Sequence, residues 1–174
     1  NAFFNCQSNA VVPYSHRLKE LPFYLQQLSM ESLGKSVTKE NDQVSINTGE
    51  ILWGTVGTNS QHSYFQLLHQ GTQFVPIDFV AIAKTRSKSV DHNEMHNHLL
   101  ANCLSQSLAL MKGNSESEEA QKKVTGNKPS NTLLIDELNP FNLGCLIALY
   151  EHKVFVQSIL WNINAFDQLG VELG

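Results

Sequence analysis

The sequence contains little cysteine. Its three cysteines, Cys6, Cys103 and Cys145, lie far apart, and no C-x-x-C pair occurs. An odd number of isolated cysteines cannot complete a disulfide framework, which excludes the small disulfide-stabilised secreted domains. The first residues also lack the basic segment and the small-residue cleavage site of a signal peptide. Both absences predict a protein of a reducing compartment, with the cytoplasm as the default location.

Positive charge is also scarce. Lys and Arg number 12 against 16 Asp and Glu, which gives a formal net charge of −4. A nucleic-acid-binding protein needs a basic face to neutralise phosphates, and no cluster of Lys and Arg provides one. The same absence argues against binding to an anionic membrane surface. We therefore expect neither a nucleic-acid nor a membrane partner.

No long apolar run is free of charge. The most apolar region, residues 139–166, is interrupted by Glu151, His152 and Lys153, whereas a membrane span needs about 20 mostly apolar residues. The 174 residues are nevertheless 41% hydrophobic, which is enough for one packed domain and argues against global disorder. The sequence begins with Asn inside an apolar stretch and stops at VELG. Domain termini are usually mobile and polar, so we expect a piece of a longer protein.

Strand-like and helix-like segments alternate along the chain. Short apolar or β-rich runs predict strands over residues 10–14, 51–53, 73–84 and 131–138. Helical spacing predicts helices over residues 16–28, 59–69, 92–111 and 140–162, with polar connections over 38–49 and 112–128. This order predicts an α/β fold, a three-layer α/β/α sandwich with a mostly parallel sheet. Ligands of such sheets bind beyond the carboxyl ends of the strands, which directs attention to the loops after Tyr14, Trp53 and Leu138.

The loop after Trp53 reads G-T-V-G over residues 54–57 and joins a predicted strand to a predicted helix. Its backbone N–H groups could meet an anion, or the two glycines could simply form a tight turn. Asn59 or Ser60 could cap the helix that follows. His62 would then lie in its first turn, where the positive helix end favours the neutral imidazole. The alternative is a solvent-facing or core histidine.

Three histidines suggest a metal site that the sequence does not complete. His92 and His96 are four residues apart and could share a helix face, with His98 close by. No cysteine or carboxylate has the spacing to complete a ligand set, and the segment resembles an exposed helix start. We therefore expect no metal.

Gln27 and Glu31 are also four residues apart and would share a helix face. Taken alone, a glutamate near a helix end is most often solvated. Gln168, in FDQLGVELG, reads on its own as a polar residue where a helix stops. None of these three residues would indicate a site without further context.

Four segments together supply that context. They are MESLGK (30–35), GTNSQHSYFQLLHQGT (57–72), NPFNLGCLIALYEHKVFVQ (139–157) and FDQLGVELG (166–174). They closely resemble the phosphoglucose isomerase family, and the last is similar to its C-terminal signature F-D-Q-x-G-V-E-x-x-K. The resemblance extends over residues 1–174 and is weakest over 84–127. On this basis the chain is identified as a member of that family.

The resemblance implies a fold and an activity. The family has two sugar-isomerase (SIS) domains, and residues 1–174 resemble most of the second, larger one, without the first domain that normally holds the sugar phosphate. The implied enzyme is a cytoplasmic aldose–ketose isomerase of glycolysis and gluconeogenesis. It interconverts glucose 6-phosphate and fructose 6-phosphate through a cis-enediolate. The reaction moves protons rather than hydride, so no cofactor is expected.

The resemblance also implies roles for four residues. Glu31 matches the family's general base, and Gln27 matches a glutamine that contacts the substrate. His62 matches the histidine that assists ring opening, which in the family reaches the active site of the neighbouring subunit. Gln168 matches another residue that lines the site. A homodimer is therefore expected, with each site completed across the interface.

Some positions depart from the family pattern. The signature lysine would follow Gly174 directly, Ser60 replaces a more usual glycine, and Thr55–Val56 stands where Glu-Pro is common. We expect the chain by itself to be inactive, without that lysine and the phosphate site. The alternative function is a non-catalytic SIS module that senses sugar phosphates. The joint presence of Gln27, Glu31, His62 and Gln168 argues against it, because a sensor needs no base.

Overall fold

The structure of the chain, a computed structural model, describes residues 4–172 and 174. Its centre is a four-stranded sheet with the order β2-β1-β3-β4. The strands are β1 (Ser8–Pro13), β2 (Ile51–Trp53), β3 (Ile77–Lys84) and β4 (Ser130–Glu137). Every neighbouring pair is parallel. The four predicted strands and the parallel sheet are thus confirmed, although β3 is shorter than the β-rich segment predicted from residue 73.

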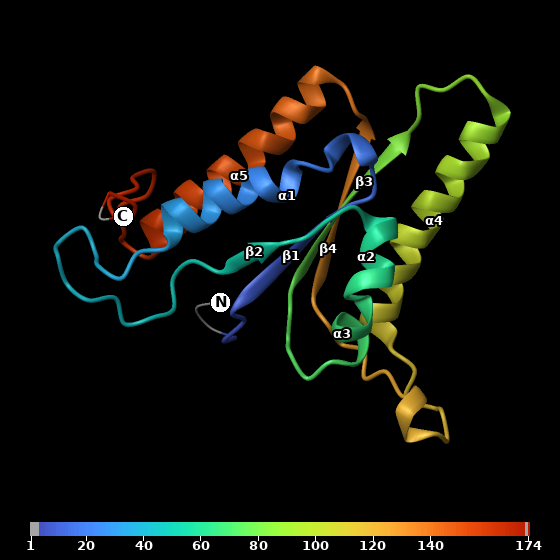
Figure 1. Ribbon diagram of the computed structural model, residues 1–174, viewed down its shortest axis with the longest axis horizontal. Helices are drawn as coiled ribbons and strands as arrows, with labels where there is room; N and C mark the ends of the chain where they lie inside the picture. The colour runs from blue at the N-terminus through green and yellow to red at the C-terminus, as the bar shows by residue number, and fades with distance from the viewer. Residues whose placement is uncertain (1–3, 173) are drawn as a thin grey trace.

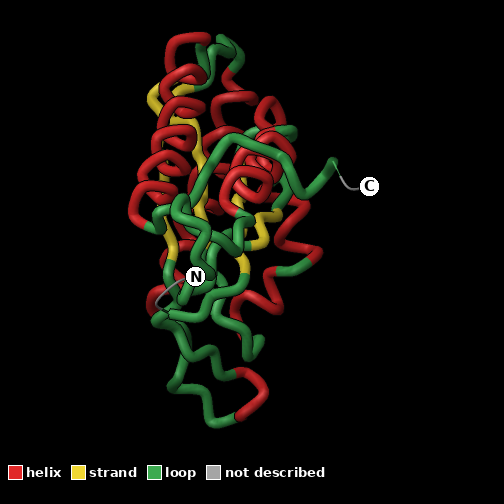
Figure 2. Tube along the Cα trace, turned by 90° about the vertical axis from the view of Figure 1, so that its left-hand side faces the viewer, coloured by secondary structure: helices red, strands yellow, loops and turns green. Residues whose placement is uncertain are grey.

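Helices cover both faces of the sheet. On one face lie α1 (Leu21–Gln26), the π-helical turn η2 (Gln27–Glu31) and α5 (Pro140–Leu160). The other face carries α2 (Gly57–Ser63), α3 (Phe65–Gln70) and α4 (Val90–Lys112). Figure 1 shows the sheet between the two helical layers, and Figure 2 shows helices overlapping the strands after a turn of 90°. Two short 3₁₀ turns, η1 (His16–Leu18) and η3 (Ala120–Lys122), complete the elements. The predicted α/β/α sandwich is confirmed.

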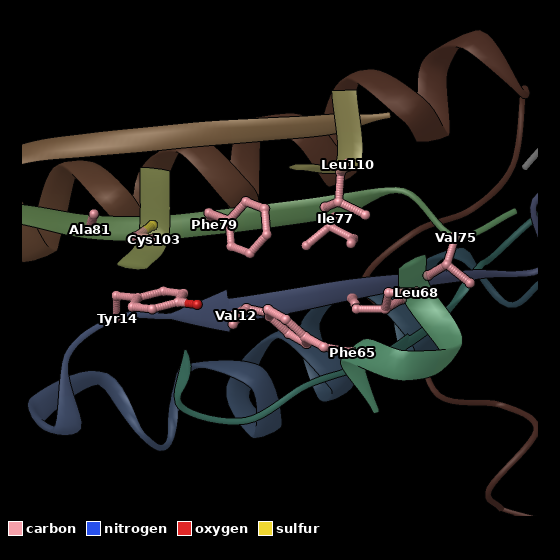
Figure 3. Packing of buried hydrophobic residues seen from close by; sticks show 11 residues of the cluster. Val12, Tyr14, Phe65, Leu68, Val75, Ile77, Phe79, Ala81, Cys103 and Leu110 are labelled. Carbon is pink, nitrogen blue, oxygen red and sulfur yellow. The ribbon is translucent and has the colours of Figure 1, made fainter. Parts of the chain in front are cut away.

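Successive residues of the central strands alternate between the two cores, as the pleat of a strand requires. Val12 of β1 and Phe79 of β3 point towards α3 and α4, where they meet Phe65 and Leu110 (Figure 3). The next residues along the strands, such as Val11 and Val80, join the core under α1 and α5. Burial on both faces explains why residues 10–13 of β1 and 79–83 of β3 are apolar without alternation.

Helix α5 packs on the sheet through a stripe of buried residues at every fourth position, Leu146, Tyr150, Val154 and Ser158. A hydrogen bond from the Tyr24 hydroxyl to Glu151, at 3.3 Å, joins it to α1. Many of its other apolar side chains are exposed. By length and composition α5 is a candidate membrane span. The interruption at residues 151–153 therefore does not exclude a span, contrary to the expectation from the sequence. Its packing is that of a helix covering a sheet.

Two predicted helices differ in detail. The helix expected over residues 16–28 is divided into η1, α1 and η2 and continues to Glu31. The helix expected over 59–69 begins at Gly57 and is interrupted at Tyr64. Neither Asn59 nor Ser60 caps it, because Val56 occupies the N-cap position without a side-chain bond. The Ser60 hydroxyl lies inside the turn, 2.9 Å from the carbonyl oxygens of Thr55 and Val56.

Candidate active site

Topology determines where Glu31 and Gln168 lie. Because β1 and β2 are parallel, α1 and η2 must carry the chain back to the amino edge of the sheet, where the strands begin. Glu31 is the last residue of η2 and therefore lies at that edge. Helix α5 follows β4 and runs back in the same way, so the residues after Leu160 arrive at the same edge and on the same face (Figure 1).

A cleft of about 530 Å³ opens where these two returning segments meet. Its walls come from residues 30–41 and 164–171, and both Glu31 and Gln168 line it. The structure thus brings together two of the four residues predicted for the site. The expectation that this site would lie beyond the carboxyl ends of the strands is wrong for these residues, because each of them follows a helix rather than a strand.

The turn that carries Glu31 is a π-helix, Gln27–Glu31. Such turns are uncommon, are less tightly wound than an α-helix and occur frequently at functional sites. Gln27 and Glu31 are its first and last residues. Ser29, between them, is buried. Gln27 does not line the cleft, and its side chain is exposed. It is therefore accessible from the solvent rather than from within the cleft. Sequence spacing gave no indication of the π turn.

Apolar contacts hold the C-terminal segment against this turn. Leu33, Val154 and Ile163 form a small buried cluster between the segment after η2, helix α5 and the chain beyond it. Backbone pairing continues the contact, since Lys39 N–H donates to the Asn162 carbonyl at 2.9 Å. Residues 163–168 are therefore fixed by packing as well as by their connection to α5.

Lys35 joins the two walls of the cleft directly. Its ammonium donates to the Glu31 carbonyl oxygen at 2.7 Å and to the Asp167 carbonyl oxygen at 2.8 Å. It also forms an ion pair with the Asp167 carboxylate at 2.8 Å. Both side chains are less than one-third exposed, and ionised hydrogen bonds of this kind are the stronger ones. Sequence reasoning assigned no role to Lys35 or Asp167, although both lie inside the quoted motifs.

Gly34 allows the chain to turn tightly between Glu31 and Lys35. A Cβ atom at this position would lie 2.6 Å from the Met30 carbonyl oxygen, which is too close for any other residue without a shift of the backbone. The Thr48 hydroxyl donates to the Lys35 carbonyl and ties the same turn to the loop before β2. The position of Glu31 therefore depends on the absence of a side chain at Gly34.

The structure does not bring His62 to this cleft. His62 lies on α2, which follows the carboxyl end of β2 and covers the opposite face of the sheet. Its side chain is exposed. His62 belongs to the last turn of a short helix, so the predicted placement in the first turn is wrong, and with it the argument that a positive helix end keeps the ring neutral. Within one chain, His62 and Glu31 occupy opposite faces and opposite edges.

The glycines before His62 are accounted for by packing. A Cβ atom at Gly57 would lie 2.4 Å from the Tyr14 ring, and one at Gly54 would lie 1.8 Å from the Val11 carbonyl oxygen. Gln61 donates to the Tyr14 hydroxyl at 2.9 Å. These contacts press the loop onto β1 and favour the tight-turn interpretation over an anion site.

The three histidines of α4 do not gather into a metal site. His92 contacts the Ser87 hydroxyl at 2.9 Å, and His96 contacts the Ala83 carbonyl oxygen at 3.3 Å. Across residues 4–172 and 174, no group of three His, Cys, Asp or Glu side chains is placed to hold a metal ion.

Comparison with known proteins gives a consistent result over the whole chain. The family model described as phosphoglucose isomerase matches residues 1–174. A glucose-6-phosphate isomerase of Chlorobium luteolum is 52% identical, and one of Acinetobacter baumannii is 53% identical; the matches cover 100% of this chain. The chain spans only 34% of the length of each of these relatives.

Solved structures agree with the sequence matches. The crystal structure of a glucose-6-phosphate isomerase from Chlamydia trachomatis superimposes with a TM-score of 0.91 at 42% identity, over 99% of this chain and 34% of that one. A Thermus thermophilus protein at 24% identity, with a TM-score of 0.73 over 97% of this chain, shares the fold. The parallel α/β/α sandwich is therefore of the SIS type, and the chain belongs to the phosphoglucose isomerase family.

Proposed function

We propose that this chain is most of the second SIS domain of a cytoplasmic glucose-6-phosphate isomerase, and that it contributes the general base. The protein would interconvert glucose 6-phosphate and fructose 6-phosphate in glycolysis and gluconeogenesis. Membership of the family and the names of its relatives support the activity. The observation that carries the proposal is the cleft at the amino edge, where Glu31 and Gln168 line one space and Lys35 joins its walls.

Glu31 supplies the chemistry that an aldose–ketose isomerisation requires. As a carboxylate it takes the proton from C2 of the open-chain sugar, and the electron pair of that bond forms the C1–C2 double bond of a cis-enediolate. As a carboxylic acid it returns the proton to C1, while a hydroxyl proton moves from O2 to O1. One positioned carboxyl group thus acts first as base and then as acid, which typically contributes about 10²–10⁴-fold to a rate. No cofactor is required for this proton transfer.

Gln168 would contact the sugar inside the cleft, and Gln27, at the other end of the turn that carries Glu31, would contact a part of it that extends beyond the cleft. His62 would assist ring opening in the site of a second subunit, since its own chain places it on the far face of the sheet. An exposed histidine on a short helix, with a well-anchored loop before it, suits a residue that reaches into a neighbour. The functional unit proposed here is therefore a homodimer with shared sites.

The substitution Glu31→Gln in the full-length protein tests the assignment. We expect turnover to fall at least 10²-fold because an amide cannot accept the C2 proton, while binding of fructose 6-phosphate persists. Glu20→Gln is a matched control, since Glu20 is an exposed glutamate just before α1 and lies away from the cleft. With [2-²H]glucose 6-phosphate as substrate, the transfer can be followed directly. Deuterium that appears at C1 of the product or in the solvent reports removal of the C2 proton.

Two outcomes would contradict the proposal. If Glu31→Gln retains turnover, Glu31 is not the base. If the wild-type protein binds sugar phosphate but moves no proton between C2 and C1, the non-catalytic sensor is the correct reading. We further propose that the 174 residues alone are inactive, because they span about a third of their relatives. Measurable isomerisation by this segment in isolation would refute that point.

A further inference from the structure

A second cavity lies at the opposite edge of the sheet from the cleft that holds Glu31. The strand order β2-β1-β3-β4 makes the gap between β1 and β3 the point where the connections reverse direction. The chain leaving β1 turns to the α1 face, and the chain leaving β3 turns to the α4 face (Figure 1). Crevices at such switch points are the usual ligand sites of open α/β sheets.

The cavity at this position has a volume of about 160 Å³. The loop after β1 forms one wall, the end of β3 with the following loop forms another, and the end of β4 closes it. Leu99 and His96 of α4 complete the lining. This volume is large enough to admit a small polyatomic anion, such as a tetrahedral oxyanion.

The lining carries more positive than negative groups, in a protein whose net charge is −4. The ionisable lining residues comprise three cationic side chains, two histidines and one carboxylate. In order along the chain they are His16, Arg17, Lys84, Arg86, His96 and Glu137. An excess of one sign of charge around a cavity raises the local concentration of counter-ions. The charge balance of the lining thus favours an anion over a cation, although the net charge of the molecule is negative.

The cations differ in how far they are already neutralised. Arg86 is paired with Glu137 across the cavity, and Lys84 is paired with Asp136 at 2.7 Å outside the lining. The guanidinium of Arg17 has no hydrogen bond or ion pair with any other residue that the structure describes. Arg17 is therefore the cation with its full donor capacity left for a ligand, and a planar guanidinium matches two oxygens of a phosphate.

We propose that this carboxyl-edge cavity binds a phosphate group, and that Arg17 is its principal ligand, with Arg86 in support. The site is at the other edge of the sheet from Glu31, so the ligand would act as a second, separate occupant. The chemistry is shared by inorganic phosphate and by the phosphoryl group of a phosphate monoester. Either would place its charge between the ends of β1 and β3.

Calorimetric titration of the full-length protein with inorganic phosphate, at constant ionic strength, tests the proposal. Constant ionic strength is needed because salt screens exposed charges. Arg17→Gln should weaken one phosphate-binding phase about tenfold or more, the size expected for losing a charge-assisted hydrogen bond. Lys19→Gln is the matched control: Lys19 is exposed, carries the same charge two residues away and does not line the cavity. It should change the same phase less than twofold.

A second pair of variants repeats the comparison on another loop. Arg86→Gln should weaken the same phase, whereas Lys88→Gln, an exposed position outside the lining, should not. Titration with glucose 6-phosphate separates the two sources. A tighter Arg17-dependent phase than with inorganic phosphate indicates a monoester, and an Arg17-dependent phase with inorganic phosphate alone indicates the free anion.

Three results would overturn the site. They are the absence of any phosphate-binding phase up to about 10 mM, a phase that Arg17→Gln leaves unchanged, and equal losses in Arg17→Gln and Lys19→Gln, which would show only a general charge effect. These experiments measure phosphate binding and not turnover. Their outcome therefore tests the phosphate site independently of the isomerase assignment.

Discussion

The Lys35 ammonium and the Asp167 carboxylate, 132 residues apart in sequence, meet at 2.8 Å and join the turn that carries Glu31 to the segment that carries Gln168. The same ammonium binds the Glu31 carbonyl oxygen at 2.7 Å. The backbone of the proposed base and that of the C-terminal wall therefore share one cation, and the geometry of the cleft depends on it.

Removal of this cation should loosen the cleft. In the full-length protein, Lys35→Met should lower kcat/KM about 10–100-fold, since a group displaced by about 1 Å loses rate on that scale. Lys35→Arg should recover part of the loss because it retains charge and donors. Lys39→Met is the control, as Lys39 is an exposed lysine on the same cleft. Equal losses in both methionine variants would show that net charge, not the Lys35 contacts, matters.

Subunit mixing tests whether His62 acts on a neighbour. In the proposed homodimer, we expect the Glu31→Gln and His62→Asn variants each to be nearly inactive. After unfolding and refolding of an equal mixture, about half of the dimers are mixed, and each mixed dimer regains one native site if sites are shared. Activity should therefore return to about a quarter of the wild-type value. No recovery in dimers shown to have exchanged would mean that Glu31 and His62 act within one subunit.

Gly34→Ala should disturb both folding and catalysis. The new Cβ would lie 2.6 Å from the Met30 carbonyl oxygen, so the backbone must move next to Glu31. We expect a loss of about 1–3 kcal/mol in the free energy of unfolding, the usual range for overpacking, together with a lower kcat. Gly144→Ala, in α5, has nothing within 4 Å of its Cβ and should be neutral or slightly stabilising. Urea denaturation and steady-state rates decide between these outcomes.

Ile163→Ala should detach the C-terminal wall by removing its buried anchor. Ile163 is fully buried with Leu33 and Val154, and truncation of a buried isoleucine costs about 2–5 kcal/mol. Ile159→Ala, four residues earlier and 52% exposed, should cost much less. Limited proteolysis after residue 160 should be faster only in the first variant. Similar rates in both would mean that the cluster does not hold the wall.

Burial of Cys103 should make stability fall in alkali. Desolvation raises the pKa of this fully buried thiol from 9.0 to about 12. The unfolded thiol loses its proton above pH 9 while the folded one keeps it, so this contribution to stability is complete below pH 9 and declines as the pH rises towards 12. The slope should be roughly 1 kcal/mol per pH unit. Between pH 8 and pH 11, the urea concentration at the unfolding midpoint should fall less steeply in Cys103→Ala than in the wild type. Equal slopes would mean that the Cys103 thiol does not cause the alkaline loss of stability.

Much of the fold followed from local patterns in the sequence. Val11, Val12, Phe79 and Val80 lie in runs that are apolar on both sides, which marks central parallel strands. The helix predicted from residue 140 begins there as α5, with Pro140 in its first turn and Asn139 as its cap. The boundaries around Glu31 did not follow, because a π turn has no residue preference that distinguishes it from the α-helix before it.

The site was harder to place than the fold. The rule that ligands bind at carboxyl ends directed attention to Tyr14, Trp53 and Leu138, whereas Glu31 lies where a crossover helix ends. The Lys35–Asp167 contact is a long-range pair that depends on α1 and α5 returning side by side. Such a pair has no local signature, and the motif resemblance, which covers both residues, assigned neither of them a role.

Helix α5 has a practical consequence for anyone preparing the 174-residue segment. Beyond its buried stripe it turns Phe141, Phe155 and Leu160 outward, each more than half exposed. Bare aromatic and aliphatic surface of this kind drives proteins together in water. A purified sample should therefore scatter light increasingly as it is concentrated, and mild detergent should disperse it.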